Sequence, residues 1–206
     1  MLNYKKMPKV ELHLHLDGSV RPETAAKLLG IDIAEARKNM IADDKCLDLN
    51  DYLTKFFIPG EVMQTKKNLE LISEEIAADL EEDGVIYAEI RFAPLKHIFK
   101  GLSLDEVVES VLKGLAKKSL KTNLILCMMR GDKEEDNIKV VDLAERFLNR
   151  GVVALDLAGA ESIYKTIDYK NLFAYAKGKN IPFTIHAGEA DGKDSMKAAI
   201  DFGAKR

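Results

Sequence analysis

The chain has 206 residues, of which 47% are hydrophobic and 32% are charged, and its 34 acidic and 31 basic residues give a formal net charge of -3. This composition is typical of a soluble globular protein and excludes collagen-like, disordered and membrane-spanning chains. Both signs of charge are spread along the chain, so it has neither a basic footprint for nucleic acid nor a polybasic segment for a membrane surface. We therefore expect a small-molecule partner.

The cysteine content and the N-terminal segment indicate a cellular location. Cys46 and Cys127 are the only cysteines and no C-x-x-C motif occurs, which excludes a disulfide framework and a thiolate zinc site. The first nine residues lack the apolar segment of a signal peptide, and no run of about 18 apolar residues could span a bilayer. We expect a cytoplasmic protein.

Short apolar runs alternate with longer helical periodicities, a pattern typical of βα units and a mostly parallel sheet. The runs predict five strands, at 10–16, 85–91, 123–129, 152–158 and 181–186. About seventy residues, 18–84, separate the first two strands and hold two or three additional helical patterns. Such an insertion commonly covers a functional site.

Three amphipathic helices are predicted to pack on this sheet. Ser103 and Glu106 form a capping box in front of the apolar stripe of the second helix, which covers 104–115. The stripes of the other two helices end before Gly84 and Gly151. Their members are Leu69, Ile72, Ile76 and Leu80, and Ile138, Val141, Ala144 and Leu148.

A repeat of strands and helices closes either as a doubly wound sheet or as a barrel. The turn at 17–23 contains no G-x-G-x-x-G and no G-x-x-x-x-G-K-[ST] occurs elsewhere, so a nucleotide-phosphate fold loses its main support. A complete (β/α)8 barrel takes about 250 residues and eight strands. We expect an α/β fold, an incomplete TIM-type barrel in which 1–206 form the N-terminal part of one domain, with strands 1–5 present and 6–8 absent. Open sheet edges then predict self-association.

The first strand alternates apolar and ionisable residues. A period of two places Glu11, His13, His15 and Asp17 on one face, which would line the barrel mouth. The other face would pack outward against helices and holds Val10, Leu12, Leu14 and Leu16. Two histidines at i and i+2 aim their imidazoles at one point, which suits a shared zinc ion at about 2.0 to 2.1 Å. The alternative is a solvent-facing H-x-H motif on an edge strand.

A third histidine and a carboxylate follow the fifth strand. His186 comes at the C-terminal end of this strand, where barrel enzymes keep their chemistry. Gly188 permits a tight turn that could bring Glu189 back over the site as a proton shuttle. The alternative for Glu189 is a carboxylate in the first turn of a helix, which the helix dipole favours.

Four further residues are considered for the site. Three of them have both a structural and a functional interpretation, and His97 has a structural one. Gly159, at the end of the fourth strand, indicates either a bend or a close approach of the backbone to a ligand. His97 is interpreted as a loop residue near the mouth and not as a fourth ligand. Tyr52 and Phe56, four residues apart in the insertion, indicate a helix packing face or a cover over an aromatic substrate.

These motifs together resemble the adenosine deaminase family of the amidohydrolase superfamily. The resemblance rests on PKVELHLHLDG at 8–18 with RPET at 21–24, YAEIRFAP at 87–94, LDLAG at 155–159 and IHAGE at 185–189. It implies hydrolytic deamination of adenosine and 2'-deoxyadenosine to inosine and ammonia, with one zinc ion. The lack of lysine at 152–159 agrees with a single metal, because related binuclear enzymes bridge two metals with a modified lysine on that strand.

The resemblance also implies roles for individual residues. His13, His15 and His186 would bind zinc, and Glu189 would protonate purine N1. Substrate contacts are implied for His15, for Asp17 with the ribose 5'-hydroxyl, and for the backbone N–H of Gly159 with purine N3. Tyr52 and Phe56 would belong to the apolar cover over the nucleoside.

The chain departs from the family pattern in two ways. Ala160 stands where the family usually has an aspartate, and the segments that carry a further catalytic histidine and two aspartates do not occur. The 206-residue chain is therefore expected to have little activity alone. The alternatives are a deaminase of adenine, AMP or another aminopurine, and a non-catalytic fragment or paralogue of the fold. Zinc deaminases of flipped bases are excluded, because their H-x-E and P-C-x-x-C motifs are missing.

Overall fold

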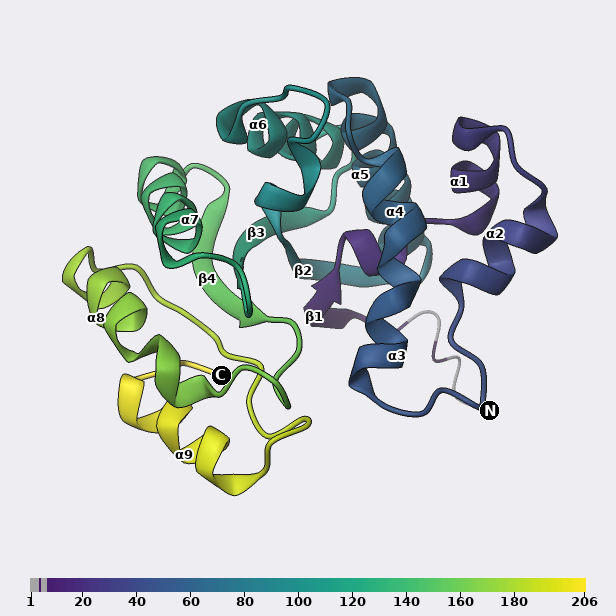
Figure 1. Cartoon of the computed structure of the whole chain (residues 1–206). Helices are drawn as coiled ribbons and strands as arrows, with labels where there is room; N and C mark the ends of the chain where they lie inside the picture. Colours follow the sequence, from purple (N-terminus) through teal and green to yellow (C-terminus); the bar gives the residue numbers. More distant parts are fainter. Residues whose placement is uncertain (1–3, 5–6) are drawn as a thin grey trace. The chain divides into compact units, whose positions relative to one another are not determined.

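The computed structural model describes residue 4 and residues 7–206. Residues 1–3 and 5–6, part of the N-terminal stretch without a signal-peptide pattern, lie outside the described residues. The chain divides into two compact units, Met1–Leu124 and Ile125–Arg206 (Figure 1). The boundary falls within strand β3, Lys121–Met129, so this strand contributes to both units.

In the first unit, the sheet has the order β1-β2-β3, with β1 at Lys9–His15 and β2 at Val85–Phe92. Strands β1 and β2 pair in parallel, and Leu14 lies opposite Ile90. An irregularity interrupts the register between Glu11 and Leu14. Within it, the N–H of His13 donates to the Glu11 carboxylate at 2.7 Å, and the buried Arg91 donates to the Leu12 carbonyl at 2.8 Å.

This irregularity corrects the predicted alternation of β1. Val10 and Leu12 are 56% and 37% exposed, whereas Leu16 is fully buried. An extra residue in one strand breaks the period of two, so residues on either side of it no longer share a face. The apolar side chains of β1 therefore do not form the continuous helix-covered face that the sequence pattern predicts.

The insertion after β1 contains more helical turns than predicted. Helix α1 begins at Pro22, which supplies a preformed φ, and stops at Gly30, whose φ is +69°. The elements of the insertion are η2 (Asp17–Ser19), α1 (Pro22–Leu29), α2 (Ile33–Met40), α3 (Leu49–Leu53), η3 (Thr54–Phe56), α4 (Phe57–Val62) and α5 (Lys66–Glu82).

Helices α5 and α6 (Leu104–Leu115) lie side by side in the first unit (Figure 1). The predicted apolar stripe of α5 is buried, and the capping box of Ser103 and Glu106 is present at the start of α6. Gly114 permits the close approach of the two helices, because a Cβ atom there would lie 2.3 Å from the carbonyl oxygen of Glu70. The predicted stripe of α5 and the predicted capping box of α6 are confirmed.

The second unit contains the rest of β3 beside β4 (Val152–Ala158). Residues 125–129 of β3 and all residues of β4 except Asp156 are apolar, and most of them are buried, which is typical of a parallel sheet. The helices are α7 (Glu134–Phe147), α8 (Lys170–Gly178) and α9 (Lys193–Phe202), with a short η5 (Thr166–Tyr169). In α7, Val141 and Ala144 of the predicted stripe are buried.

The predicted fifth strand forms only a single bridge. Leu155 pairs in parallel with Phe183, and the N–H of His186 donates to the Leu157 carbonyl at 3.1 Å. Pro182 has no N–H and can only accept, here from Leu155 at 2.9 Å. The segment therefore runs beside β4 without forming a regular strand.

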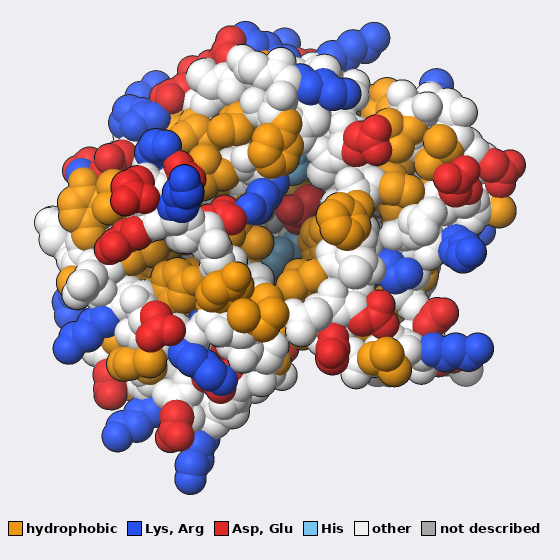
Figure 2. All heavy atoms as spheres, viewed as in Figure 1, with side chains coloured by type: hydrophobic (Ala, Val, Ile, Leu, Met, Phe, Trp, Pro, Cys, Tyr) orange, Lys and Arg blue, Asp and Glu red, His pale blue; other side chains and the backbone are white. Residues whose placement is uncertain are grey.

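Four parallel strands with helices give an α/β fold, as predicted. Among the described residues, no helix is both long enough and apolar enough to cross a membrane. Acidic and basic side chains are interspersed on the face drawn in Figure 2. This distribution agrees with the balanced charge of the sequence.

Candidate active site

His13 and His15 lie at the C-terminal end of β1 in the first unit. Their ring centroids are 5.5 Å apart and the rings are tilted by 38°. His13 is exposed and His15 is half-buried. Despite the irregularity in β1, the two imidazoles are therefore neighbours, as two ligands of one ion must be.

An aromatic cluster lies beside His15. Phe56 packs edge-on against the His15 ring, with centroids 6.4 Å apart, and Tyr52 packs edge-on against Phe56 at 5.6 Å. The two residues belong to different elements, α3 and η3, so they do not form one regular helix face. Gly18 allows Phe56 to approach, because a Cβ atom there would lie 3.3 Å from its ring.

Asp17 opens the short η2 turn that follows β1. Its Oδ1 atom accepts a hydrogen bond from the N–H of Gly18 at 3.1 Å. Burial disfavours the charged form and raises the pKa of Asp17 to about 6, although hydrogen bonds from the backbone of Gly18 and Asp17 act in the opposite direction. This carboxyl group therefore differs from an ordinary surface aspartate.

In the second unit, a buried carboxylate faces His186. The Nδ1 atom of His186 lies 2.7 Å from Oδ2 of Asp156, which is fully buried on β4. The hydroxyl of Thr184 donates to the other carboxylate oxygen at 2.9 Å. Sequence reasoning assigned no role to Asp156, although an acidic residue within an otherwise apolar strand is a signal that could have identified it.

Glu189 is exposed and lies in a bend, four residues before the start of α9 at Lys193. It does not belong to the first turn of that helix, so the structural alternative for this carboxylate is wrong. Gly188 has a φ of +84°, and a Cβ atom there would lie 2.4 Å from Cγ of Met196. The predicted tight turn at Gly188 is confirmed, and only glycine suits it.

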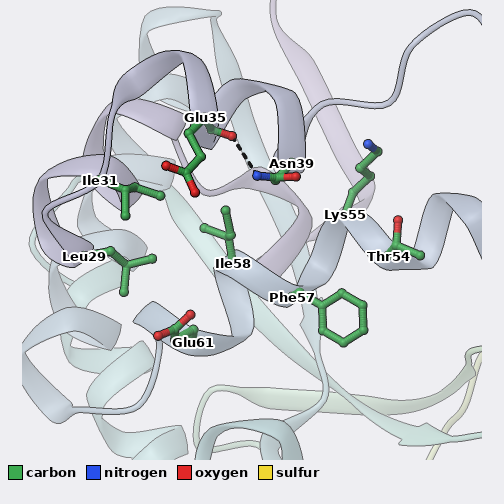
Figure 3. A pocket seen from close by; sticks show the side chains of 9 residues that line it. All are labelled: Leu29, Ile31, Glu35, Asn39, Thr54, Lys55, Phe57, Ile58 and Glu61. Atoms are coloured by element: carbon green, nitrogen blue, oxygen red, sulfur yellow. Dashed lines mark hydrogen bonds between the residues drawn. The ribbon is translucent and has the colours of Figure 1, made fainter.

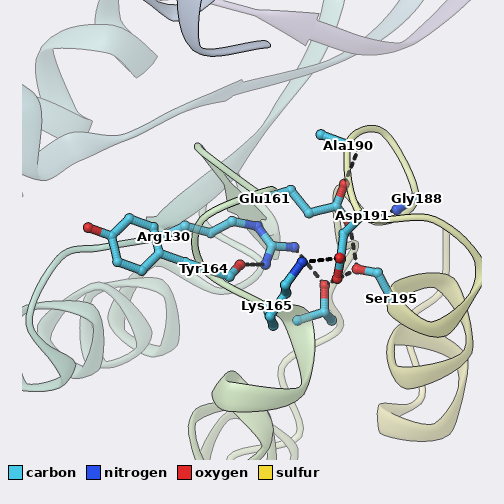
Figure 4. A network of polar contacts seen from close by, with 9 residues as sticks. Arg130, Glu161, Tyr164, Lys165, Gly188, Ala190, Asp191 and Ser195 are labelled. Atoms are coloured by element: carbon cyan, nitrogen blue, oxygen red, sulfur yellow. Dashed lines mark hydrogen bonds and ion pairs between the residues drawn. The ribbon is translucent and has the colours of Figure 1, made fainter. Parts of the chain in front are cut away.

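A polar network holds the backbone of this turn (Figure 4). Glu161, only 1% exposed, accepts hydrogen bonds from the N–H groups of Gly188 and Ala190, both at 2.7 Å, and from the Ser195 hydroxyl. Arg130 donates to the carbonyl oxygen of His186 at 2.6 Å. Sequence reasoning missed Glu161 and Arg130, because neither residue belongs to a motif with a local spacing rule.

Gly159 directly follows β4 and forms a bend with a φ of +105°. A Cβ atom there would lie 3.4 Å from the backbone nitrogen of Arg130. The adjacent Ala160 is half-buried, and its carbonyl oxygen accepts hydrogen bonds from the N–H groups of Ile163 and Tyr164. The side chain at position 160 has no part in these bonds.

His97 does not lie in a loop. It ends the short η4 helix, Pro94–His97, is fully buried, and packs against Phe92 with ring centroids 5.7 Å apart. Burial lowers the pKa of His97 to about 4. The interpretation that His97 is not a metal ligand stays a prediction. The interpretation that it is a loop residue is wrong, because His97 belongs to η4 and is buried.

The insertion in the first unit has a separate hollow of about 420 Å³. It lies among α1, α2, η3 and α4 (Figure 3) and contains none of the predicted site residues. Glu35 and Glu61 contribute carboxylates, and Leu29, Ile31 and Ile58 contribute apolar walls. The chemistry predicted from the sequence therefore does not involve this hollow.

The chain is similar to known deaminases over nearly its whole length. The sequence profile of the family described as adenosine deaminase matches residues 8–206. An adenosine deaminase of Clostridium botulinum is 41% identical over 213 residues, which cover 98% of this chain and 64% of that protein. The chain thus spans about two thirds of the length of the curated relatives that it matches.

Solved structures of deaminases and of an amidohydrolase have a fold similar to that of this chain. The crystal structure of the N6-mAMP deaminase of Arabidopsis has a TM-score of 0.85 and 26% identity, with 98% of this chain and 65% of that chain covered. A Burkholderia ambifaria amidohydrolase with bound Zn has a TM-score of 0.87 and 20% identity, with 98% and 58% covered. This second likeness concerns the fold alone.

Proposed function

Because the chain belongs to the adenosine deaminase family, we propose that it supplies the metal-binding and proton-donating parts of a zinc-dependent deaminase of adenosine and 2'-deoxyadenosine. The overall reaction adds water at C6 of the purine and releases ammonia, which leaves inosine. The observation that carries the proposal is the contact between His186 and the buried Asp156. Such a carboxylate partner is typical of a histidine that binds a metal through its other nitrogen.

The donor set suits one zinc ion. His13 and His15 are adjacent at the end of β1, and the contact of His186 Nδ1 with Asp156 leaves Nε2 as the donor. Neutral imidazoles are common zinc ligands in hydrolytic sites. In this proposal His13, His15 and His186 hold the ion, which when bound lowers the pKa of a water molecule toward 7 and so supplies a nucleophile at neutral pH.

The remaining site residues act on the substrate. Glu189 donates a proton to purine N1, which makes C6 more electrophilic. The N–H of Gly159 donates to purine N3, and Asp17 contacts the ribose 5'-hydroxyl. His15 also lies against the purine, and Tyr52 and Phe56 exclude water from above it, in keeping with their packing beside His15.

A deaminase of an aminopurine nucleotide or base is the second candidate. The N6-mAMP deaminase of Arabidopsis is 26% identical to this chain over 98% of its length. A nucleotide substrate would place a phosphate where adenosine has its 5'-hydroxyl. Asp17 would then oppose it, because a carboxylate repels a phosphate unless one of them is protonated. Asp17 therefore favours a nucleoside over a nucleotide.

A substrate comparison tests the proposal. The chain is extended with the C-terminal segment of the Clostridium botulinum relative, supplied with zinc, and given adenosine, AMP, N6-methyl-AMP and adenine in parallel. We expect kcat/KM for adenosine to exceed the other values at least tenfold. Preference for a nucleotide would transfer the assignment to the second candidate, and no turnover of any aminopurine would favour a non-catalytic role.

Metal binding is tested separately in the 206-residue chain. Zinc is titrated against a chromophoric chelator with the unaltered chain and with His13→Asn, His15→Asn and His186→Asn. Each substitution is expected to weaken zinc binding at least tenfold. His97→Asn is the matched control and is expected to retain the zinc affinity. Unchanged affinity in all three ligand variants would contradict the assigned ligand set.

A further inference from the structure

Glu161 has the environment of a residue that is built to hold one conformation of the turn at 188–190. It lies three residues after the end of β4 and is 1% exposed. A buried carboxylate is costly unless its oxygens are satisfied by donors. Each oxygen of Glu161 has at least one donor, and two of the three donors are backbone N–H groups.

The two N–H groups belong to the residues on either side of Glu189. The N–H of Gly188 donates to Oε1 and the N–H of Ala190 donates to Oε2, both at 2.7 Å. The Ser195 hydroxyl, in the first turn of α9, donates to Oε1 as well. One side chain therefore ties the turn both to the loop after β4 and to the start of α9.

Charge strengthens this arrangement. Burial alone would raise the pKa of Glu161, but hydrogen bonds from Ser195, Ala190 and Gly188, together with the positive charge of Arg130, lower it overall. Glu161 is thus ionised at neutral pH, and hydrogen bonds to a charged acceptor are stronger than neutral ones.

Arg130 binds a carbonyl group of the same segment, whereas Glu161 binds its N–H groups. Its guanidinium donates to the carbonyl oxygen of Tyr164 at 2.7 Å (Figure 4). It also donates to the carbonyl oxygen of His186 at 2.6 Å and to the hydroxyl of Thr166 at 2.8 Å. A cation therefore binds the backbone carbonyl at one end of the segment 186–190, and an anion binds the N–H groups near its other end.

We propose that Glu161 is the positioning residue for Glu189: its carboxylate holds the 187–188 and 189–190 peptide groups, which flank Gly188 and Glu189, so that the Glu189 side chain projects in one direction. Glu161 does not touch the substrate in this arrangement and acts only through the backbone. The catalytic part of the inference rests on the proposed function, in which Glu189 is the acid. A general acid must be held within hydrogen-bond reach of the atom that it protonates.

The geometric part is tested without any turnover. Amide hydrogen exchange is measured in the full chain for Glu161→Gln and for Glu145→Gln, a control in the same unit whose carboxylate is exposed and pairs with Lys179. In glutamine one carboxylate oxygen is replaced by an NH2 group, which cannot accept from an N–H group, so at least one of the two bonds is lost. Exchange at Gly188 or Ala190 is therefore expected to accelerate at least tenfold in Glu161→Gln. Exchange at the β4 residues Leu155 and Leu157 should stay unchanged in both variants.

Unchanged exchange at Gly188 and Ala190 would overturn the inference. If Glu161→Gln does not fold, Glu161→Asp replaces it, because the shorter side chain keeps the charge but cannot reach both N–H groups. Acceleration spread equally over β4 would also contradict a local role, since it would indicate general destabilisation.

The catalytic part is tested by a double-mutant cycle in the extended protein. Glu161→Gln is expected to lower kcat for adenosine by 10- to 100-fold and to change KM less than threefold. In a Glu189→Gln background, Glu161→Gln should change kcat less than twofold, because residues that act as a unit are not additive. If the two substitutions lowered kcat independently, so that the loss in the double variant equalled the product of the single losses, the positioning role of Glu161 would be overturned. Unchanged kcat in Glu189→Gln would refute the proposed acid, while the exchange data would still decide whether Glu161 holds the turn.

Discussion

The Nδ1 atom of His186 lies 2.7 Å from Oδ2 of Asp156, a carboxylate with no exposed surface. Asp156 comes from β4, and His186 ends the segment that pairs with β4 through the bridge between Leu155 and Phe183. The backbone pairing therefore brings the two side chains together. A ring held in this way has one defined orientation, which favours binding of an ion by its second nitrogen.

This contact predicts that Asp156 supports metal affinity. Asp156→Asn keeps the size of the side chain but removes its charge, so zinc binding is expected to weaken by about 10- to 100-fold. Zinc titration of the full chain against a chelator measures the change. Asp168→Asn, at an exposed position in the same unit, is the control. Affinities within twofold of each other in the two variants would contradict the role of Asp156.

The turn at Gly188 predicts a stability difference between two glycines. Both Gly188 and Gly30 have positive φ, but a Cβ atom at Gly188 would meet Met196 at 2.4 Å, whereas one at Gly30 would meet nothing within 4 Å. Gly30→Ala is expected to cost about 1 kcal/mol of unfolding free energy through its left-handed backbone. Gly188→Ala adds overpacking and is expected to cost about 2 to 4 kcal/mol. Urea unfolding compares the two variants, and equal losses would refute the predicted clash.

Burial of neutral His97 predicts a loss of stability in acid. Its pKa is lowered by burial from 6.5 to about 4, so the unfolded chain binds this proton first as the pH falls. Because the pKa of His97 is lower in the folded state, its contribution to the unfolding free energy is fully present above pH 6.5 and is lost as the pH falls from 6.5 to 4. The loss from pH 7 to pH 4.5 is about 2 kcal/mol.

The variant His97→Gln isolates this contribution, because glutamine does not titrate. Urea unfolding of the full chain at pH 7 and pH 4.5 gives the two differences in free energy. The unaltered chain should lose about 2 kcal/mol more than His97→Gln over this interval. Equal losses would show that His97 has the same pKa in both states.

The exposed part of β1 predicts association between copies of the 206-residue chain. Strand β1 lies at the end of the sheet order, and Val10 and Leu12 are 56% and 37% exposed. An exposed edge strand with apolar side chains is a template for pairing. Sedimentation at increasing concentration should reveal species heavier than 23.0 kDa, which the double variant Val10→Lys and Leu12→Lys reduces. A monodisperse unaltered chain at all concentrations would refute the prediction.

Local patterns predicted the regular elements well. The stripes of α5 and α6 repeat at helical spacing, and the capping box of Ser103 and Glu106 is satisfied within four residues. Residues 124–129 of β3, and β4 apart from Asp156, are apolar runs, as is typical of strands buried on both faces. In each of these cases, neighbours along the chain determine the outcome.

Local sequence patterns did not predict features of the structure that depend on residues far apart in the chain. The irregularity in β1 depends on how Glu11 and Leu14 pair with β2, and no alternation in sequence reveals it. Asp156 and Glu161 gain their importance from partners 27 to 34 residues away. Resemblance to a family supplied the candidate ligands and acid, but not the residues that hold them.

The most direct test of the central claim is ammonia release from adenosine. The purified 206-residue chain and the version extended with the Clostridium botulinum segment are assayed side by side with zinc supplied. We expect ammonia and inosine in equal amounts from the extended protein, abolished by His186→Asn, and little or none from the 206-residue chain. Absence of ammonia from a folded, zinc-loaded extended protein would contradict the assignment as an adenosine deaminase.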